Sequence, residues 1–94
     1  MTQTTNINAV LNERGERYGK FVEHASLTQQ FKTIMREHSA VNEKFMDDDQ
    51  TEALEMIFHK IARILNGDPD YADSWVDIAG YAQLVADRLN GFSR

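Results

Sequence analysis

The chain has 94 residues, of which 41% are hydrophobic and 27% charged, a balance typical of one small globular domain. It contains no cysteine, which excludes disulfides and thiolate metal sites, and no apolar run approaches the roughly 20 residues of a membrane span. The N-terminal MTQTTNINAV has no basic flank or apolar core of a signal peptide. We therefore expect a single domain over residues 1–94, frayed at 1–5, in a cytoplasmic protein without membrane contact.

The net charge of −5 is unevenly distributed. Residues 1–46 carry six Lys and Arg against five Glu, whereas residues 47–94 carry four basic residues against ten acidic ones. Binding to duplex DNA needs a basic surface, so the acidic second half argues against it. The same acidity is compatible with divalent cations, with a basic partner, or with solubility alone.

A first helix is expected after Asn6 or Asn8, either of which can cap it, and Gly19 is expected to end it. Three cations, Arg14, Arg17 and Lys20, surround Tyr18 near this end. In one interpretation the cations meet a phosphate while Tyr18 stacks on a base. In the other, the cations offset the helix dipole while Tyr18 and Phe21 anchor the loop on the core.

A second helix is expected from about Ser26, with an end either near His38 or as late as Phe45. Its apolar side comprises Leu27, Phe31, Ile34 and Met35. The acidic run Asp47–Asp49 lacks the ligand spacing and central glycine of a calcium loop. We interpret it as a helix start, with Asp48 or Asp49 as the cap and Asp49 with Glu52 at the capping-box offset.

The last two helices form the clearest pattern. The third is expected from about Thr51 to Leu65, stopped by Asn66-Gly67, and the fourth begins after Asp70 or Asp73 and continues to Leu89. A linker of about five residues makes them an antiparallel hairpin. The fourth is expected to point Trp75, Ile78, Ala79, Ala82, Val85, Ala86 and Leu89 inward. The fold class is therefore all-α, a bundle of three to four helices.

Large apolar groups are numerous for so short a chain, namely Phe21, Phe31, Phe45, Trp75, Tyr81 and Phe92. Some of them are expected to serve a subunit interface, which predicts a homo-oligomer.

Acidic residues recur beside both apolar stripes of this hairpin. At about 100° per residue, Glu52, Glu55 and His59 share an arc of roughly 60°, and Asp73 and Asp77 follow a four-residue step. Carboxylates on neighbouring helices can hold Mg²⁺ with waters left for a phosphate to replace. The candidate metal ligands are thus Glu52, Glu55, Asp73 and Asp77.

Other side chains nearby would complete such a site. His59 is a candidate ligand, phosphate contact or general base, and Lys60 and Arg63 would neutralise a polyphosphate. Alternatively, these residues are solvated helix flanks, in which Asp73 caps a helix and Glu55 pairs with His59.

The motif Glu52-x-x-Glu55, followed by an acidic pair leading into Ile78-Ala79-Gly80-Tyr81-Ala82, resembles the MazG-type all-α nucleoside triphosphate pyrophosphatases. Their pattern is EExxE, a gap, then ExxD. Here Thr51 and Glu52 stand at the paired glutamates, and Ser74 stands at the glutamate of ExxD. The resemblance implies a Mg²⁺-dependent, degenerate pyrophosphohydrolase.

A longer motif covers nearly the whole chain. The segments Glu13–Gly19, Glu52–Asp68 and Asp73–Ala82, with YG, HKIARI and DSWVDIAGYA at their centres, are similar to small phage and prophage proteins of uncharacterised function. The same arrangement resembles helical domains associated with phage nucleotide modification. The resemblance implies a phage or prophage source, and hence a host cytoplasm.

Three functions follow from these patterns. The first is a nucleotide-associated phage protein that binds a nucleoside phosphate through Mg²⁺, with or without hydrolysis. The second is a non-catalytic oligomeric protein-interaction module. The third, a nucleic-acid binder, rests only on Arg14, Arg17 and Lys20. Nucleophilic catalysis and Gly-rich phosphate loops have no support, since cysteine, a Ser–His pairing and the loop motifs are missing.

Overall fold

The structure is a computed structural model that describes residues 6–43 and 45–94. In these two stretches it has four helices and no strand: α1 (Ile7–Tyr18), α2 (Phe21–Asn42), α3 (Asp48–Asn66) and α4 (Ala72–Leu89). The predicted all-α fold is therefore confirmed. The fraying predicted for residues 1–5 lies outside the described residues.

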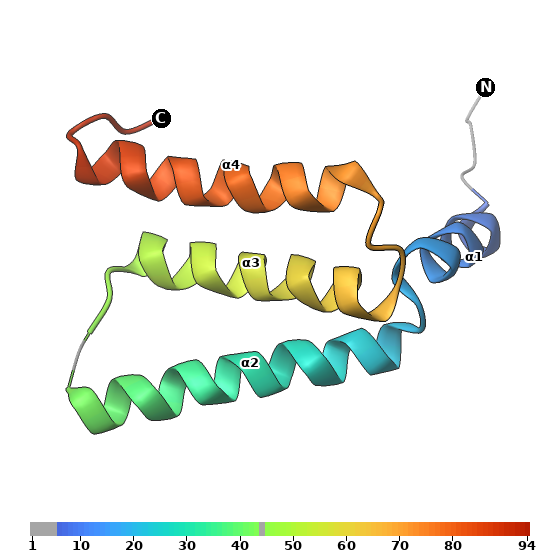
Figure 1. Ribbon diagram of the computed structural model, residues 1–94, viewed down its shortest axis with the longest axis horizontal. Coiled ribbons are helices and arrows are strands. Elements are labelled where there is room, and N and C mark those ends of the chain that lie inside the picture. The colour runs from blue at the N-terminus through green and yellow to red at the C-terminus, as the bar shows by residue number, and fades with distance from the viewer. Residues whose placement is uncertain (1–5, 44) are drawn as a thin grey trace.

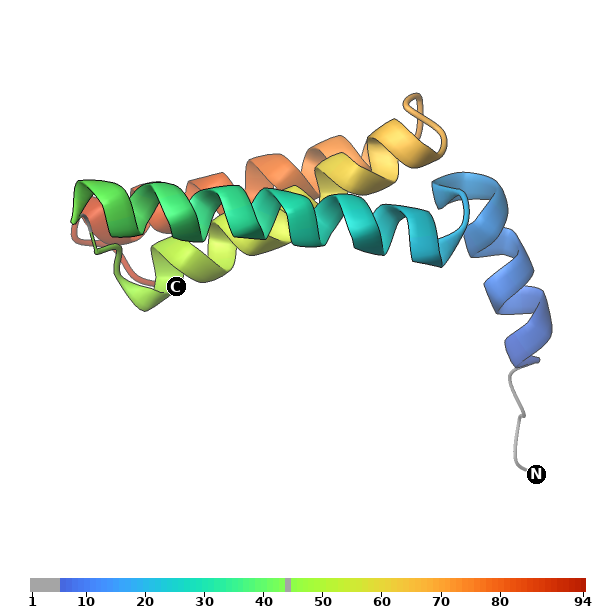
Figure 2. The ribbon, with the colours of Figure 1, turned by 90° about the horizontal axis from the view of Figure 1, so that it is seen from below.

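Three of the helices form one layer, with α3 in the middle and α2 and α4 on either side (Figure 1). Helix α3 packs along both neighbours, and within the described residues α2 and α4 have no contact with each other. Helix α1 leaves the end of the layer steeply to one side, as the edge-on view shows (Figure 2). The predicted antiparallel hairpin is formed by α3 and α4, joined by residues 67–71.

The first two helices are separated by only two residues. Asn6 caps α1, since its side chain accepts a hydrogen bond from the Ala9 N–H, and Gly19 ends the helix as predicted. Helix α2 then begins at Phe21, five residues before the predicted start at Ser26, because Gly19, with a positive φ of 74°, turns the chain into the next helix without a longer loop. It ends at Asn42, between the two predicted ends near His38 and Phe45.

The start of α3 differs from the prediction by three residues. Asp47 is the cap, and it forms a capping box with Gln50 instead of the predicted pairing of Asp49 with Glu52. Asp48 and Asp49 therefore lie in the first helical turn, where negative charge suits the positive end of the helix dipole. The predicted stop at Asn66-Gly67 is confirmed.

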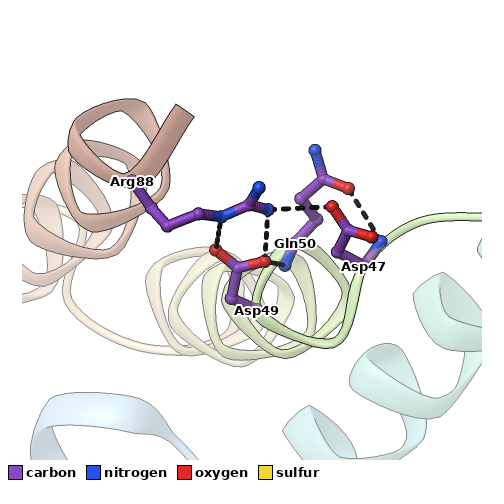
Figure 3. A network of polar contacts seen from close by, with 4 residues as sticks. All are labelled: Asp47, Asp49, Gln50 and Arg88. Atoms are coloured by element: carbon purple, nitrogen blue, oxygen red, sulfur yellow. Dashed lines mark hydrogen bonds and ion pairs between the residues drawn. The ribbon is translucent and has the colours of Figure 1, made fainter. Parts of the chain in front are cut away.

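The guanidinium of Arg88, near the last turn of α4, contacts the start of α3 (Figure 3). Arg88 near the end of α4 donates to both oxygens of Asp49, at 2.8 and 2.6 Å, and to Asp47 at 3.1 Å. The hydrogen bonds from Arg88 are the largest cause that holds the pKa of Asp49 below its usual range. This pairing fixes the open end of the hairpin, opposite the loop.

Helix α4 begins after Tyr71, which makes no side-chain cap, so neither Asp70 nor Asp73 caps it as predicted. Asp68 holds the loop instead, because its carboxylate accepts a hydrogen bond from the Asp70 N–H at 2.9 Å. The helix ends at Leu89 as expected.

The prediction that the α4 stripe points inward is wrong for most of the stripe in a single chain. Only Ile78 and Val85 are half-buried, whereas Trp75 is 55% exposed, Leu89 is 58% exposed, and Ala79, Ala82 and Ala86 are exposed. The physical reason is that a single layer of helices has no second layer to cover this side. The apolar residues that the described structure buries are Ala53 and Ala62, both on the central α3.

Candidate functional site

The joint between α1 and α2 is packed tightly against the end of α3. A side chain on Gly19 would collide with the Asn66 backbone oxygen, and one on Gly67 would collide with the backbone of Arg17 and Tyr18. The Asn66 side-chain amide donates to the carbonyls of Tyr18 and Lys20, at 3.0 and 3.2 Å. These contacts hold the cation-rich joint at a defined position beside α3.

Two cations of the predicted phosphate-binding set are engaged with aromatic rings at this joint. The Arg17 guanidinium lies 4.5 Å from the centre of the Tyr71 ring and donates to its hydroxyl, and it also pairs with Glu13 at 2.6 Å. The Arg63 guanidinium lies 4.2 Å above the Tyr18 ring. Such stacking stabilises the corner, and the edge of the Arg17 guanidinium is already engaged by the Tyr71 hydroxyl and by Glu13.

A groove opens between α1 and α2 beside this stack, with a volume of about 550 Å³, in the range of ligand pockets. Its cations come from three elements: Arg14 on α1, Lys20 in the connection, and Arg63 on α3. No carboxylate of the described residues lines it. Its other lining residues are Leu11, Gly15, Tyr18, Gly19, Phe21, Val22 and His24. The structure thus brings together four of the six predicted phosphate-binding residues, Arg14, Tyr18, Lys20 and Arg63.

Two buried nitrogen atoms of residues that line this groove have no hydrogen-bond partner within residues 6–43 and 45–94. His24 is only 4% exposed and its Nδ1 is unpaired, and the Nε of Arg63 is also unpaired. Burial, and secondarily the charge of Arg63, lowers the pKa of His24. A buried polar group left unpaired costs about 1–3 kcal/mol, so these two atoms are a local cost to the fold.

His59 lies deeper along the same seam between α2 and α3. Its ring centre is 5.6 Å from that of His24, in an edge-on arrangement. Burial, followed by the charges of Arg63, His24, Lys60 and Lys32, lowers the pKa of His59 to about 4. The ring is therefore neutral at pH 7, and in the described part of the chain no ion pair joins it to Glu55.

The four predicted metal ligands are spread along the hairpin. Asp77 forms an ion pair with Lys60 at 2.9 Å, and Asp73 accepts a hydrogen bond from the Tyr71 hydroxyl at 2.9 Å. Glu52 lines a separate hollow near Arg88, and Glu55 is half-buried one turn further on α3. The ion pair with Lys60 shows which point of α3 faces Asp77. Glu52 lies eight residues before Lys60, which is about 12 Å along the helix axis.

Within residues 6–43 and 45–94, no three acidic or histidine side chains are close enough together to hold a metal ion. A single chain therefore does not present the four carboxylates as one Mg²⁺ site. Lys60, which was predicted to neutralise a polyphosphate, instead neutralises Asp77. The Mg²⁺ prediction stays a prediction.

The sequence did not predict the roles of His24 in the groove and of Tyr71 in the stack beside it. His24 was not recognised because the helix was predicted to begin after it, and a start at Phe21 would have aligned His24, Thr28 and Phe31 on one side. Tyr71 could not have been found, since its contact with Arg17 joins residues 54 positions apart through a loop.

These features define a small, single-layer helical protein with a basic groove at one end. A family model described as "Domain of unknown function (DUF6378)" matches residues 3–89, and the chain belongs to this family. Neither the curated proteins nor the solved structures include a significant match to it. None of the helices in the described ranges is both long and apolar enough to cross a membrane.

Proposed function

We propose that the protein binds a nucleoside phosphate in the groove between α1 and α2. The observation that carries the proposal is the convergence of Arg14, Lys20 and Arg63 on one groove without a carboxylate, beside the unpaired Nδ1 of buried His24. Cations held by three separate elements form a charged hollow in a chain whose net charge is −5. Hydrogen bonds between such cations and phosphate oxygens are among the strongest in proteins.

The two ends of the ligand would meet different surfaces. Phosphate oxygens would contact Arg14, Lys20 and the edge of Arg63, while Phe21, 73% exposed at the mouth of the groove, offers a face for the base. Tyr18 already carries the Arg63 guanidinium on one face, which makes Phe21 the better stacking partner.

The residues of one chain do not fit a Mg²⁺ site, so we derive no metal-dependent step and no hydrolysis. The proposed binding is direct, through the cations, and Mg²⁺ would enter only as the counter-ion of the nucleotide. The MazG-type resemblance, the phage or prophage source and the cytoplasmic location rest on sequence alone and accompany this proposal.

Calorimetric titration with a panel of nucleoside di- and triphosphates, with Mg²⁺ and then with EDTA, tests the proposal. Arg14→Ala and Lys20→Ala should each weaken binding by about 10- to 100-fold, because each removes one charge-assisted contact of roughly 1.5–3 kcal/mol. Arg36→Ala is the matched control, since this exposed arginine of α2 contacts only Thr33 on its own helix among the hydrogen bonds of the described residues.

Absence of heat with every nucleotide would refute the proposal, as would equal weakening by Arg14→Ala and Arg36→Ala. Binding that disappears in EDTA and in Asp77→Ala would favour the predicted metal-dependent mode over direct binding.

The second candidate function is a non-catalytic, homo-oligomeric protein-interaction module. It is favoured by the exposure of large apolar side chains, such as Val22 at 72%, Val41 at 82% and Phe45 at 90%. A folded protein that binds no nucleotide but forms a stable oligomer would support this alternative.

A further inference from the structure

The two broad faces of the helical layer differ in character. One hollow between α3 and α4 is lined by Met46, Gln50, Ala53, Leu54, Ile57, Ala82 and Val85. Another is lined by Asp49, Glu52, Ala53, Tyr81, Leu84, Val85, Arg88, Ser93 and Arg94. Since Ala53 and Val85 line both hollows, they lie between them, and the hollows open on opposite faces. The lining of the first hollow is uncharged, and that of the second carries Asp49, Glu52, Arg88 and Arg94.

Helical spacing extends the uncharged face along both helices. At about 100° per residue, Leu54, Ile57, Ile61 and Leu65 fall on the same side of α3 as the first hollow. Trp75, Ala79, Ala82, Ala86 and Leu89 fall on that side of α4. We define these nine residues as the apolar face. No Asp, Glu, Lys or Arg is among them.

Nothing in the described chain covers the apolar face. The Arg63–Tyr18 stack places α1 beside the charged side of α3, and α1 leaves the layer in one direction only (Figure 2). Residues Ser93 and Arg94 after α4 line the charged hollow. Leu65 is therefore 66% exposed, Trp75 55% and Leu89 58%.

The chain exposes more surface than a compact monomer of its mass, and the excess is large enough for a dimer interface. The chain exposes 7104 Å², whereas a compact monomer of 10.8 kDa exposes about 5,500 Å². Its Cα radius of gyration is 16.1 Å, compared with about 12 Å for a compact chain of this length. The excess of about 1,600 Å² exceeds the roughly 800 Å² that each partner buries in a standard interface.

We propose that the apolar face is the interface with a second copy of this chain. The same uncharged patch on both copies is self-complementary under a two-fold axis, and stacking the layers gives each α3 the second layer that it lacks. No large side chain in the described residues is fully buried, so the fold needs a partner that is always present with the chain. A second copy meets that condition. The inference does not depend on nucleotide binding.

Ala82→Glu tests the interface, because it places a charge at the centre of the apolar face. Wild-type protein should have twice the 10.8 kDa chain mass by light scattering at micromolar concentration. The variant should be a monomer, or should unfold where the wild type is folded. Val76→Glu is the matched control, since Val76 is 64% exposed on α4 but lies away from the apolar face, and it should leave the dimer intact.

A labelling experiment remains decisive if Ala82→Glu does not fold. The chain has no cysteine, so single-site variants Ala82→Cys and Gln83→Cys can be compared with a maleimide reagent. Both positions are exposed in the single chain. In the native protein the cysteine of Ala82→Cys should react at least about tenfold more slowly than that of Gln83→Cys, because the interface excludes solvent. In urea the two rates should be equal.

A folded wild-type monomer at micromolar concentration overturns the inference and leaves the face to a different partner. A dimer in which both cysteines react at the same native rate overturns the choice of face. Arg14→Ala and Lys20→Ala should leave the dimer unchanged, so loss of nucleotide binding and loss of assembly are separable results.

Discussion

At Gly67 the backbone of the loop between α3 and α4 lies against the backbone of α1. A Cβ there would overlap the Arg17 carbonyl and the Tyr18 Cα, neither of which is a flexible side-chain end. Gly67→Ala should therefore lower the free energy of unfolding by about 1–3 kcal/mol through overpacking, measured by urea denaturation.

The matched control for that substitution is Gly80→Ala on α4. A Cβ at Gly80 meets nothing within 4 Å, and alanine in a helix interior is favoured over glycine by about 0.5–1 kcal/mol. Gly80→Ala should therefore stabilise the protein slightly. If both substitutions change the free energy of unfolding in the same direction, the close backbone approach does not require glycine at position 67.

The sequence predicted some residues of the groove and left others out for physical reasons. The cations around Tyr18 were recognised because they are adjacent in the chain. Of the anchoring interpretation, Tyr18 stacks under Arg63 at the corner, whereas Phe21 is 73% exposed and does not anchor the loop on the core. The phosphate-binding interpretation stays a prediction. The partnership of Lys60 with Asp77 depends on the register between two helices, which composition and periodicity do not specify.

At the scale of the elements, the seam between α2 and α3 concentrates basic groups around a half-buried imidazole. Arg63, His24, Lys60 and Lys32 all disfavour a proton on His59, in addition to burial, and its pKa falls from 6.5 to about 4. The unfolded chain therefore takes up a proton on His59 as the pH falls below about 6.5, whereas the folded chain does so only near pH 4. Stability contributed by the neutral ring is present above pH 6.5 and is lost between 6.5 and 4.

This linkage predicts the pH dependence of unfolding. The free energy of unfolding from urea denaturation should fall between about pH 7 and pH 5, and it should fall less in His59→Gln, which removes the titrating ring. His38→Gln is the control, because His38 is exposed near the end of α2, and it should behave as the wild type does. An identical fall in all three proteins would contradict a neutral His59 in the folded state.

Helix ends were predictable where glycine marked them, and helix starts were less so where only a polar residue did. Gly19, Gly67 and the end at Leu89 were placed correctly. The starts of α2, α3 and α4 were misplaced, because acidic and polar residues suited several neighbouring cap positions equally. The hairpin itself followed from its two apolar stripes and a short linker.

At the scale of the whole molecule, the same stripes were misread in one respect: they were expected to meet inside one chain. The pattern of apolar residues indicates which side of a helix avoids water, but it does not indicate which molecule covers that side. The α4 stripe around Ala82 is the clearest case, since Ala82 lines a hollow beside α3 and is nevertheless exposed in the single chain.

If a second copy supplies the missing layer, folding and association are one equilibrium, and stability must depend on protein concentration. The melting temperature of wild-type protein should rise by several degrees between about 2 and about 200 µM, since mass action favours the folded dimer over unfolded chains. The melting temperature can be measured by circular dichroism at 222 nm, with the path length of the cell shortened as the concentration rises. Val76→Glu should show the same dependence, because its charge lies off the apolar face. A melting temperature that is the same across this range would mean that one chain is stable alone, and the exposed apolar face would then have to be tolerated by a monomer.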